Sequence, residues 1–148
     1  MEIRVQGADQ FAALARRLKQ AGDKELRREL YRGINRAAKP VRADIKRSAL
    51  ATLPTRGGLA ALVAGSRIRV QRRTGGASVG IRMVGTSAHD IAAMNRGVVR
   101  HPLHGNRGFW FAQAVPPGWW DRPTLATAPA ARDEIVSVIE HVKRKIEG

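Results

Sequence analysis

Residues 95–123 have the sequence NRGVVRHPLHGNRGFWFAQAVPPGWWDRP, and this stretch does most to define the fold. It holds all three tryptophans, two of the three phenylalanines and four of the seven prolines of the chain. Residues 109–115 are aromatic and alternating, which predicts a strand. Pro116-Pro117-Gly118 should end that strand, and we expect a final helix to begin between residues 124 and 131.

Helical periodicity dominates the N-terminal third. A short edge strand is predicted at residues 2–6, followed by a helix from an Asp9 cap to Gly22. Asp23 is the expected cap of a long amphipathic helix over residues 24–50. Pro40 lies inside that helix and predicts a kink or break near residues 38–39. The polar face of this helix is basic, which is typical of a solvated face and also suits an acidic partner.

A basic β-hairpin is predicted in the middle of the chain. Residues 66–73 and 79–83 alternate, and Thr74-Gly75-Gly76 between them favours a tight turn. The outward face and turn carry Arg67, Arg69, Arg72, Arg73 and Arg82. We therefore expect an α+β fold in one domain spanning residues 1–148. A small antiparallel sheet with this hairpin would pack against a long N-terminal helix pair and a C-terminal helix.

The charge of the chain is strongly positive, with a formal net charge of +15. Residues 51–108 carry 9 Lys and Arg against 1 acid, whereas residues 109–148 carry 5 of each sign. Such a balance favours phosphate or an acidic protein as partner, although an arginine-rich solvated surface explains it as well. No apolar run approaches the ~20 residues of a membrane-spanning helix, and the N-terminus lacks the apolar segment of a secretory signal.

No constellation of residues predicts an enzyme. The absence of cysteine excludes disulfides, thiolate metal sites and a cysteine nucleophile. His101 and His104 have the spacing of a metal pair but lack convincing further ligands. Ser87, His89 and Asp90 are sequence neighbours, which seldom form a triad. The glycine-rich pieces match no phosphate-binding motif, so we expect no catalytic residue, metal or cofactor.

The clustered aromatic residues allow two interpretations. Basic and aromatic side chains together can bind single-stranded nucleic acid by stacking. In a strand, however, Phe109 and Phe111 share one face and Trp110 takes the other, which fits core packing on one side and an interface on the other. Trp119 and Trp120 fit an anchor of the last helix onto the sheet.

The same stretch resembles the siphophage minor tail-component family, the tail-completion or neck proteins whose type member is encoded by the tenth gene of a lambdoid coliphage. The matching pieces are NRGVVRHP at 95–102, L-x-GNR at 103–107, WFAQ at 110–113 and PGWWDRP at 117–123. In the family these form an Arg-His-Pro turn, a Gly-Asn-Arg turn, a tryptophan-bearing strand and an entry into the last helix. The resemblance is specific over about a fifth of the chain, and elsewhere only the order of elements agrees.

This resemblance implies a structural, non-enzymatic virion protein at the head–tail junction, made in the host cytoplasm. The expected partners are further copies of the chain in a ring, often hexameric, and neighbouring connector, stopper, tail-terminator or tail-tube proteins. The assembly interface would include Arg96, Arg100, His101, Asn106, Arg107, Trp110, Trp119 and Trp120. The basic hairpin residues Arg67, Arg69, Arg72, Arg73 and Arg82 would face genomic DNA in the channel or an acidic partner.

Two alternatives stay open at this point. A tail terminator or head-closure protein of the same neck would have a similar small α+β fold. A small basic DNA-binding protein would instead bind free DNA tightly, with an affinity that falls steeply as salt rises.

Overall fold

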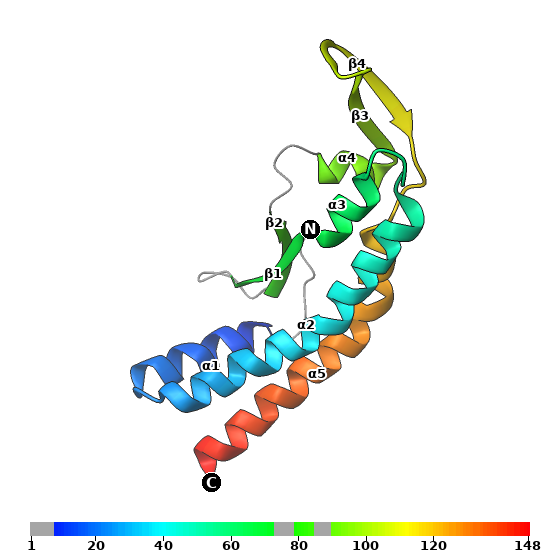
Figure 1. Ribbon diagram of the computed structural model, residues 1–148. Coiled ribbons are helices and arrows are strands. Elements are labelled where there is room, and N and C mark those ends of the chain that lie inside the picture. The colour runs from blue at the N-terminus through cyan, green and yellow to red at the C-terminus, as the bar shows by residue number, and fades with distance from the viewer. Residues whose placement is uncertain (1–7, 73–78, 85–89) are drawn as a thin grey trace. The chain divides into compact units, whose positions relative to one another are not determined.

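The computed structural model describes residues 8–72, 79–84 and 90–148 (Figure 1). In these residues the chain forms α1 Ala8–Gln20, α2 Lys24–Thr52, α3 Leu59–Gly65, β1 Arg67–Arg72, β2 Val79–Val84, α4 Ile91–Arg96, β3 Val98–Leu103, β4 Asn106–Ala114 and α5 Asp121–Glu147. The predicted α+β class is confirmed, with N-terminal helices, antiparallel strands and a C-terminal helix. The strand predicted at residues 2–6 and the turn predicted at residues 74–76 lie outside the described residues.

The described strands form two separate two-stranded sheets, β1–β2 and β3–β4. The hairpin predicted around residues 66–83 is therefore present as β1 and β2. The strand predicted at 109–115 does not join it, because that strand extends from Asn106 and pairs with β3 as a second hairpin. A pair of strands buries little by itself, so each hairpin needs other elements or a partner to cover a face.

The chain divides into two compact units that exchange segments along the sequence. Unit 1 comprises residues 1–42, 68–82 and 126–148, and unit 2 comprises residues 43–67 and 83–125. Helices α2 and α5 each contribute residues to both units. The prediction of one domain over residues 1–148 stays a prediction.

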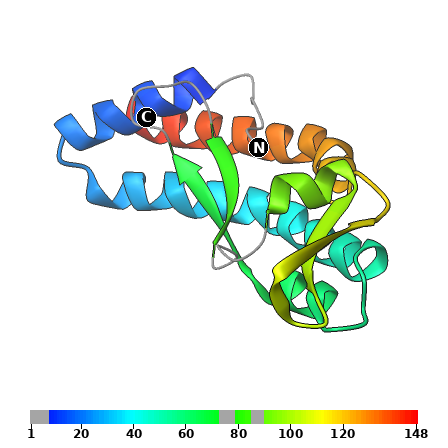
Figure 2. The same cartoon turned by 90° about the horizontal axis from the view of Figure 1, so that it is seen from above.

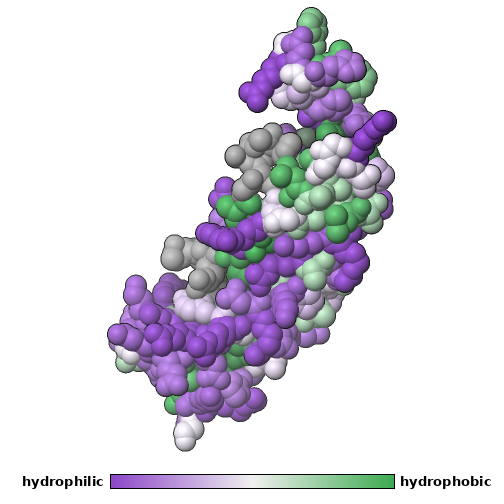
Figure 3. Space-filling model, in the orientation of Figure 1, coloured by the Kyte–Doolittle hydropathy of each residue, from purple (hydrophilic) through white to green (hydrophobic). Residues whose placement is uncertain are grey.

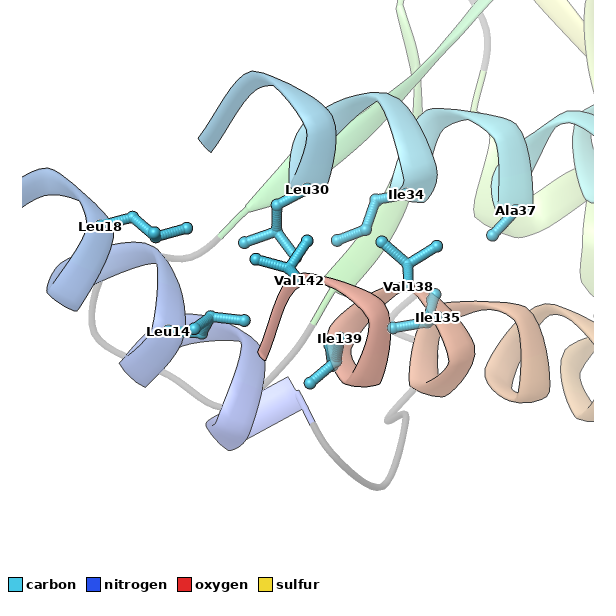
Figure 4. Close-up of a cluster of buried hydrophobic side chains, with 9 residues drawn as sticks. All are labelled: Leu14, Leu18, Leu30, Ile34, Ala37, Ile135, Val138, Ile139 and Val142. Atoms are coloured by element: carbon cyan, nitrogen blue, oxygen red, sulfur yellow. The ribbon is translucent and has the colours of Figure 1, made fainter. Parts of the chain in front are cut away.

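Unit 1 is built on three helices, with α1, the first part of α2 and the later part of α5 side by side (Figures 1 and 2). Apolar residues recur every three or four positions on each helix and point into a common core (Figure 4). The buried members are Leu14, Leu18, Leu30, Ile34, Ala37, Ile135, Val138, Ile139 and Val142. Val70 of β1 packs against this cluster. The periodicity seen in the sequence is thus the periodicity of the core.

The turn between α1 and α2 follows a standard helix stop and start. The backbone N–H of Asp23 donates to Leu18 O at 3.0 Å, and that of Gly22 donates to Lys19 O at 3.2 Å. This pattern is a Schellman cap, and Gly22 has the positive φ of 73° that it requires. Asp23 Oδ1 then accepts a hydrogen bond from the Leu26 N–H at 3.0 Å, as expected of the predicted cap.

Of the kink or break expected near residues 38–39, the break does not occur, since α2 is one helix from Lys24 to Thr52; the kink stays a prediction. Proline removes one backbone hydrogen bond and costs a helix interior roughly 3 kcal/mol. Ala37, Val41 and Ile45 on either side of it are 4%, 3% and 0% exposed. Burial of this face on both sides of the proline offsets its local cost and keeps the helix continuous.

Unit 2 contains the end of α2, α3, α4, the β3–β4 hairpin and the start of α5. Its buried apolar residues come from α2, α3, α4 and β3 and from the segments that follow α2 and β4, and they are Ile45, Ala49, Leu53, Ala60, Val63, Met94, Val99, Val115, Trp119 and Trp120. Helix α3 follows the Gly57-Gly58 loop and matches the short helix that the sequence predicts over residues 59–64. Helix α5 begins at Asp121, earlier than expected, since Pro123 falls in the first turn, where a backbone N–H has no intrahelical partner to lose.

Candidate assembly surface

Asn95 joins the first and last parts of the 95–123 stretch. Its Oδ1 accepts hydrogen bonds from the backbone N–H groups of Trp120 at 3.0 Å and Asp121 at 3.1 Å. Its Nδ2 donates to Asp121 Oδ2 at 2.7 Å, and its carbonyl oxygen accepts from Gly118 N at 2.7 Å. One side chain therefore caps the start of α5 from 25 residues away. Asn95 is not among the predicted site residues, because no local sequence pattern indicates so distant a cap.

A glycine and an aspartate fix the base of the β3–β4 hairpin. Asp90 Oδ1 accepts from Ala93 N at 2.9 Å and caps α4. Gly97 ends α4 with a φ of 103°, and its carbonyl oxygen accepts from Val115 N at 2.9 Å. A Cβ at position 97 would lie 3.0 Å from Val115 O. Glycine thus permits the sharp exit from α4 and the close return of the chain after β4.

The hairpin turns at His104-Gly105. Both residues have positive φ, 49° and 78°, as a two-residue turn matched to strand twist requires. The Arg-His-Pro turn expected at 100–102 is wrong, because these residues pair with Ala112, Phe111 and Trp110 inside β3. Proline is tolerated in a two-stranded sheet because each strand has an edge that needs no N–H donor. A register shift follows directly, between Pro102 and Leu103.

The aromatic strand β4 is uncovered on both faces. All nine of its residues are exposed, including Phe109 at 67%, Trp110 at 56% and Phe111 at 56%. The expectation that one face of this strand packs into the core is therefore wrong for the isolated chain. Strand alternation does place Trp110 on the face opposite to that of Phe109 and Phe111, but no described element of unit 2 covers either face of β4. The hairpin extends beyond α3 and α4 of its unit (Figure 1).

Contacts within the hairpin order its exposed rings. The ring of His101 lies 6.1 Å from that of Phe111, its cross-strand partner, at an interplanar angle of 47°. Trp110 pairs with Pro102, and its indole Nε1 donates to Arg107 O at 3.0 Å. Gly108 N donates to Asn106 Oδ1 at 2.9 Å next to the turn. The side chains are thus held in place before any partner binds, which lowers the entropy cost of binding.

A hollow of about 400 Å³ lies at the foot of the hairpin. Its lining comes from α4 with its cap and from both strands, and consists of Asp90, Ala93, Met94, Val98, Val99, Arg100 and Trp110. Arg100 and Trp110 of the predicted assembly interface are brought together here. Asp90 is the only acid among residues 51–108, and it adds a negative charge to this hollow. It was not among the residues predicted for this site.

The two adjacent tryptophans are interior residues. Trp119 and Trp120 are 1% and 5% exposed, and their rings pack edge to face at 5.7 Å and 83°. Their burial favours the role of anchors for α5, and it removes them from the surface that a second subunit can reach. Their Nε1 atoms are buried without a hydrogen-bond partner among the described residues.

The remaining predicted interface residues lie at the surface. Arg96, Arg100, Asn106 and Arg107 are exposed, and His101 is half-buried. All five lie on α4 or the β3–β4 hairpin. Hydrophobic and hydrophilic residues alternate over this hairpin in Figure 3. The surface therefore combines exposed aromatic rings with basic side chains at their margin.

The basic β1–β2 hairpin also has the predicted orientation. Ile68 and Ile81 are buried at 3% and 6%, whereas Arg67, Arg69 and Arg82 are exposed. Of the other two predicted arginines, Arg73 lies outside the described residues and only the backbone of Arg72 is described.

No three His, Cys, Asp or Glu side chains in the described ranges could hold a metal ion. No helix in those ranges has the length and apolarity to cross a membrane. No protein-family model matches the chain. No curated protein and no solved structure matches it either.

Proposed function

We propose that this chain is a non-enzymatic subunit of a phage-type neck, a tail-completion protein that assembles as a homo-oligomeric ring at the head–tail junction. The proposal combines the resemblance of residues 95–123 with one structural observation, the exposure of the β3–β4 hairpin. The ring, its layer in the neck and its contacts with connector or tail-tube proteins are all part of the proposal.

The exposed aromatic hairpin carries this proposal. Phe109, Trp110 and Phe111 are large apolar side chains that water contacts in the isolated chain. Clusters of this kind on a soluble protein mark interaction surfaces, and aromatic residues together with arginine are enriched at the centres of protein interfaces. A contact between this hairpin and a different patch on the next copy would be head-to-tail, the arrangement that closes into rings.

Light scattering and negative-stain imaging at about 50 mM and about 500 mM salt test the assembly. We expect ring-sized oligomers at both concentrations, because a contact made by aromatic burial is only weakly screened. The variant Phe109→Thr/Phe111→Thr should be monomeric, since threonine retains strand propensity while removing both rings. The matched control Leu125→Gln/Val136→Gln removes two exposed apolar residues from α5 and should assemble normally.

Wild-type protein that is monomeric at both salt concentrations would overturn the self-assembling ring. Assembly that survives in the hairpin variant would overturn the hairpin as its contact. The neck assignment has a separate test in the order of the flanking genes: a neck protein should be encoded between capsid and tail-tube genes. A location among unrelated metabolic genes would remove that assignment.

A further inference from the structure

A groove of about 870 Å³ in unit 1 lies between the first part of α2 and the later part of α5. Lys24, Arg28, Arg32 and Arg36 line its α2 side, and Glu134 and Arg144 are among the α5 residues opposite. The four basic residues recur at every fourth position. Successive members are therefore about 6 Å apart along the helix axis and lie on nearly the same face.

This row of like charges disfavours the helix that carries it, because cations at i and i+4 repel one another. Only Arg36 is neutralised by a partner, with its Nε 3.3 Å from Glu134 Oε1. The side chains of Lys24, Arg28, Arg32 and Arg144 make no hydrogen bond or ion pair with the described part of the chain. A set of mutually repelling, unpaired cations in one groove is explained if an anion occupies it.

Two of the three carboxylates that line the groove are already paired with basic side chains other than Lys24, Arg28, Arg32 and Arg144. Glu29 lies 2.9 Å from His141 Nε2 and 3.0 Å from Lys145 Nζ. The hydrogen bond from Lys145 lowers the pKa of Glu29. Partial burial raises this pKa, whereas the hydrogen bond with His141 lowers it further. Glu134 is held by Arg36. Of the three groove carboxylates, Glu25 is the one that has no basic partner among the described residues, and its place in the first turn of α2 suits the helix dipole.

We propose that this groove binds the phosphate backbone of a nucleic acid, with Arg28 and Arg32 as the main phosphate contacts and Lys24 and Arg144 beside them. Arginine matches the planar geometry of phosphate through two parallel N–H donors. The row is straight and regular, as a contact to a repeating polyanion requires. This assignment does not depend on the neck function, and it places the anion-binding site on the helices instead of on the β1–β2 hairpin.

The lining favours nucleic acid over an acidic protein. Val138 is the one apolar residue among those that line the groove, no Phe, Tyr or Trp side chain is present, and the one aromatic ring, that of His141, is paired with Glu29. A protein interface would need an apolar centre to anchor its partner, whereas phosphate contacts are charged and polar throughout. Contacts to phosphate carry no sequence information, and the groove has no Phe, Tyr or Trp platform for bases, so the binding should depend little on sequence.

Fluorescence anisotropy with a labelled duplex of roughly 30 base pairs, titrated over a range of salt concentrations, tests the groove. We expect Arg28→Gln/Arg32→Gln to bind about tenfold more weakly near physiological salt and to lower the slope of log K against log salt by about 2. The control Arg17→Gln/Arg56→Gln removes the same charge at exposed positions outside the groove. It should stay within about threefold of wild type and keep its slope.

Glutamine preserves helix propensity, and the loss of two mutually repelling charges favours α2, so the groove variant should melt at or slightly above the wild-type temperature by circular dichroism. The control, with one exposed helix position and one loop position, should melt with the wild type. Equal losses in the groove variant and the control would overturn the proposal, because the binding would then follow net charge alone. A single-stranded probe that shows the same groove dependence would support it with a different nucleic acid. Polyglutamate that displaces the duplex at equal charge concentration would overturn it in favour of an acidic protein partner.

Discussion

Asn95 shows how one side chain controls a stretch of chain that contains three tryptophans. It accepts hydrogen bonds from two backbone N–H groups at the start of α5 and donates to the side chain of Asp121. The first N–H groups of a helix have no partner inside the helix, so a cap supplied from elsewhere in the chain is worth as much as a local one. Trp119 and Trp120, which are buried, lie immediately before this capped start of α5.

Asn95→Ala should lower the free energy of unfolding by about 1–3 kcal/mol, because two helix donors and the Asp121 carboxylate lose their partner. Urea denaturation followed by tryptophan fluorescence measures this change. Asn35→Ala is the matched control, since the Asn35 amide only contacts Tyr31 O within the same exposed helix face. A loss of equal size in both variants would contradict the capping role of Asn95.

At the scale of elements, the contact between α2 and α5 depends on the absence of a side chain. A Cβ at Gly33 would lie 2.4 Å from Val138 Cγ1 and 2.6 Å from Val138 Cγ2. The residues at this contact are buried on both helices, with Ile34 of α2 at 2% and Val138 of α5 at 6% exposure. Glycine weakens a helix interior by roughly 1 kcal/mol relative to alanine, and close packing against α5 compensates for this.

Gly33→Ala should destabilise the protein by about 1–3 kcal/mol, since the added methyl overlaps the Val138 side chain in a packed core. Thermal melting by circular dichroism measures the loss. Gly65→Ala, at the end of α3, has open space around the new methyl and should leave stability unchanged or slightly raised. Gly33→Ala that is as stable as wild type would show that the two helices do not approach this closely.

The helices and strands themselves were largely predictable. Local patterns placed α1, α2, α3, the β1–β2 hairpin and the strand at 109–115, because helix and strand periodicities are properties of neighbouring residues. The errors came from distant contacts. The core residues around Pro40 keep α2 continuous, and α5 starts at Asp121, where Asn95 caps it and Pro123 is tolerated in the first turn. The β3–β4 pairing was missed because the turn at His104-Gly105 follows a proline that suggested an earlier turn.

At the scale of the whole molecule, α2 and α5 each run through both compact units. If the part of either helix in one unit unfolds, the part in the other unit loses the helical turn that it continues. The tryptophans all lie in unit 2, whereas most residues of α1, α2 and α5 belong to unit 1. Fluorescence and helix circular dichroism therefore report mainly on different units.

We expect the unfolding transitions observed by tryptophan fluorescence and by circular dichroism at 222 nm to coincide. Gly33→Ala in unit 1 should lower both midpoints together, because the two units share their long helices. Separate transitions, or a Gly33→Ala shift confined to the circular dichroism signal, would mean that the units unfold independently. Oligomers raise apparent stability by mass action, so the comparison must be made at one protein concentration.

The amino-acid sequence by itself determined the helices, the alternating strands, the basic surface and the α+β class, since these depend on local periodicity and composition. Only the tertiary structure decided which faces are covered. Alternation showed that Phe109 and Phe111 share a face, but their exposure depends on whether another element lies against it, and none in unit 2 does. Trp119 and Trp120 are equally aromatic and are buried, in a segment whose backbone hydrogen-bonds to Asn95. The groove also depends on tertiary structure, because it forms only where the row of Lys24 and three arginines on α2 lies opposite α5.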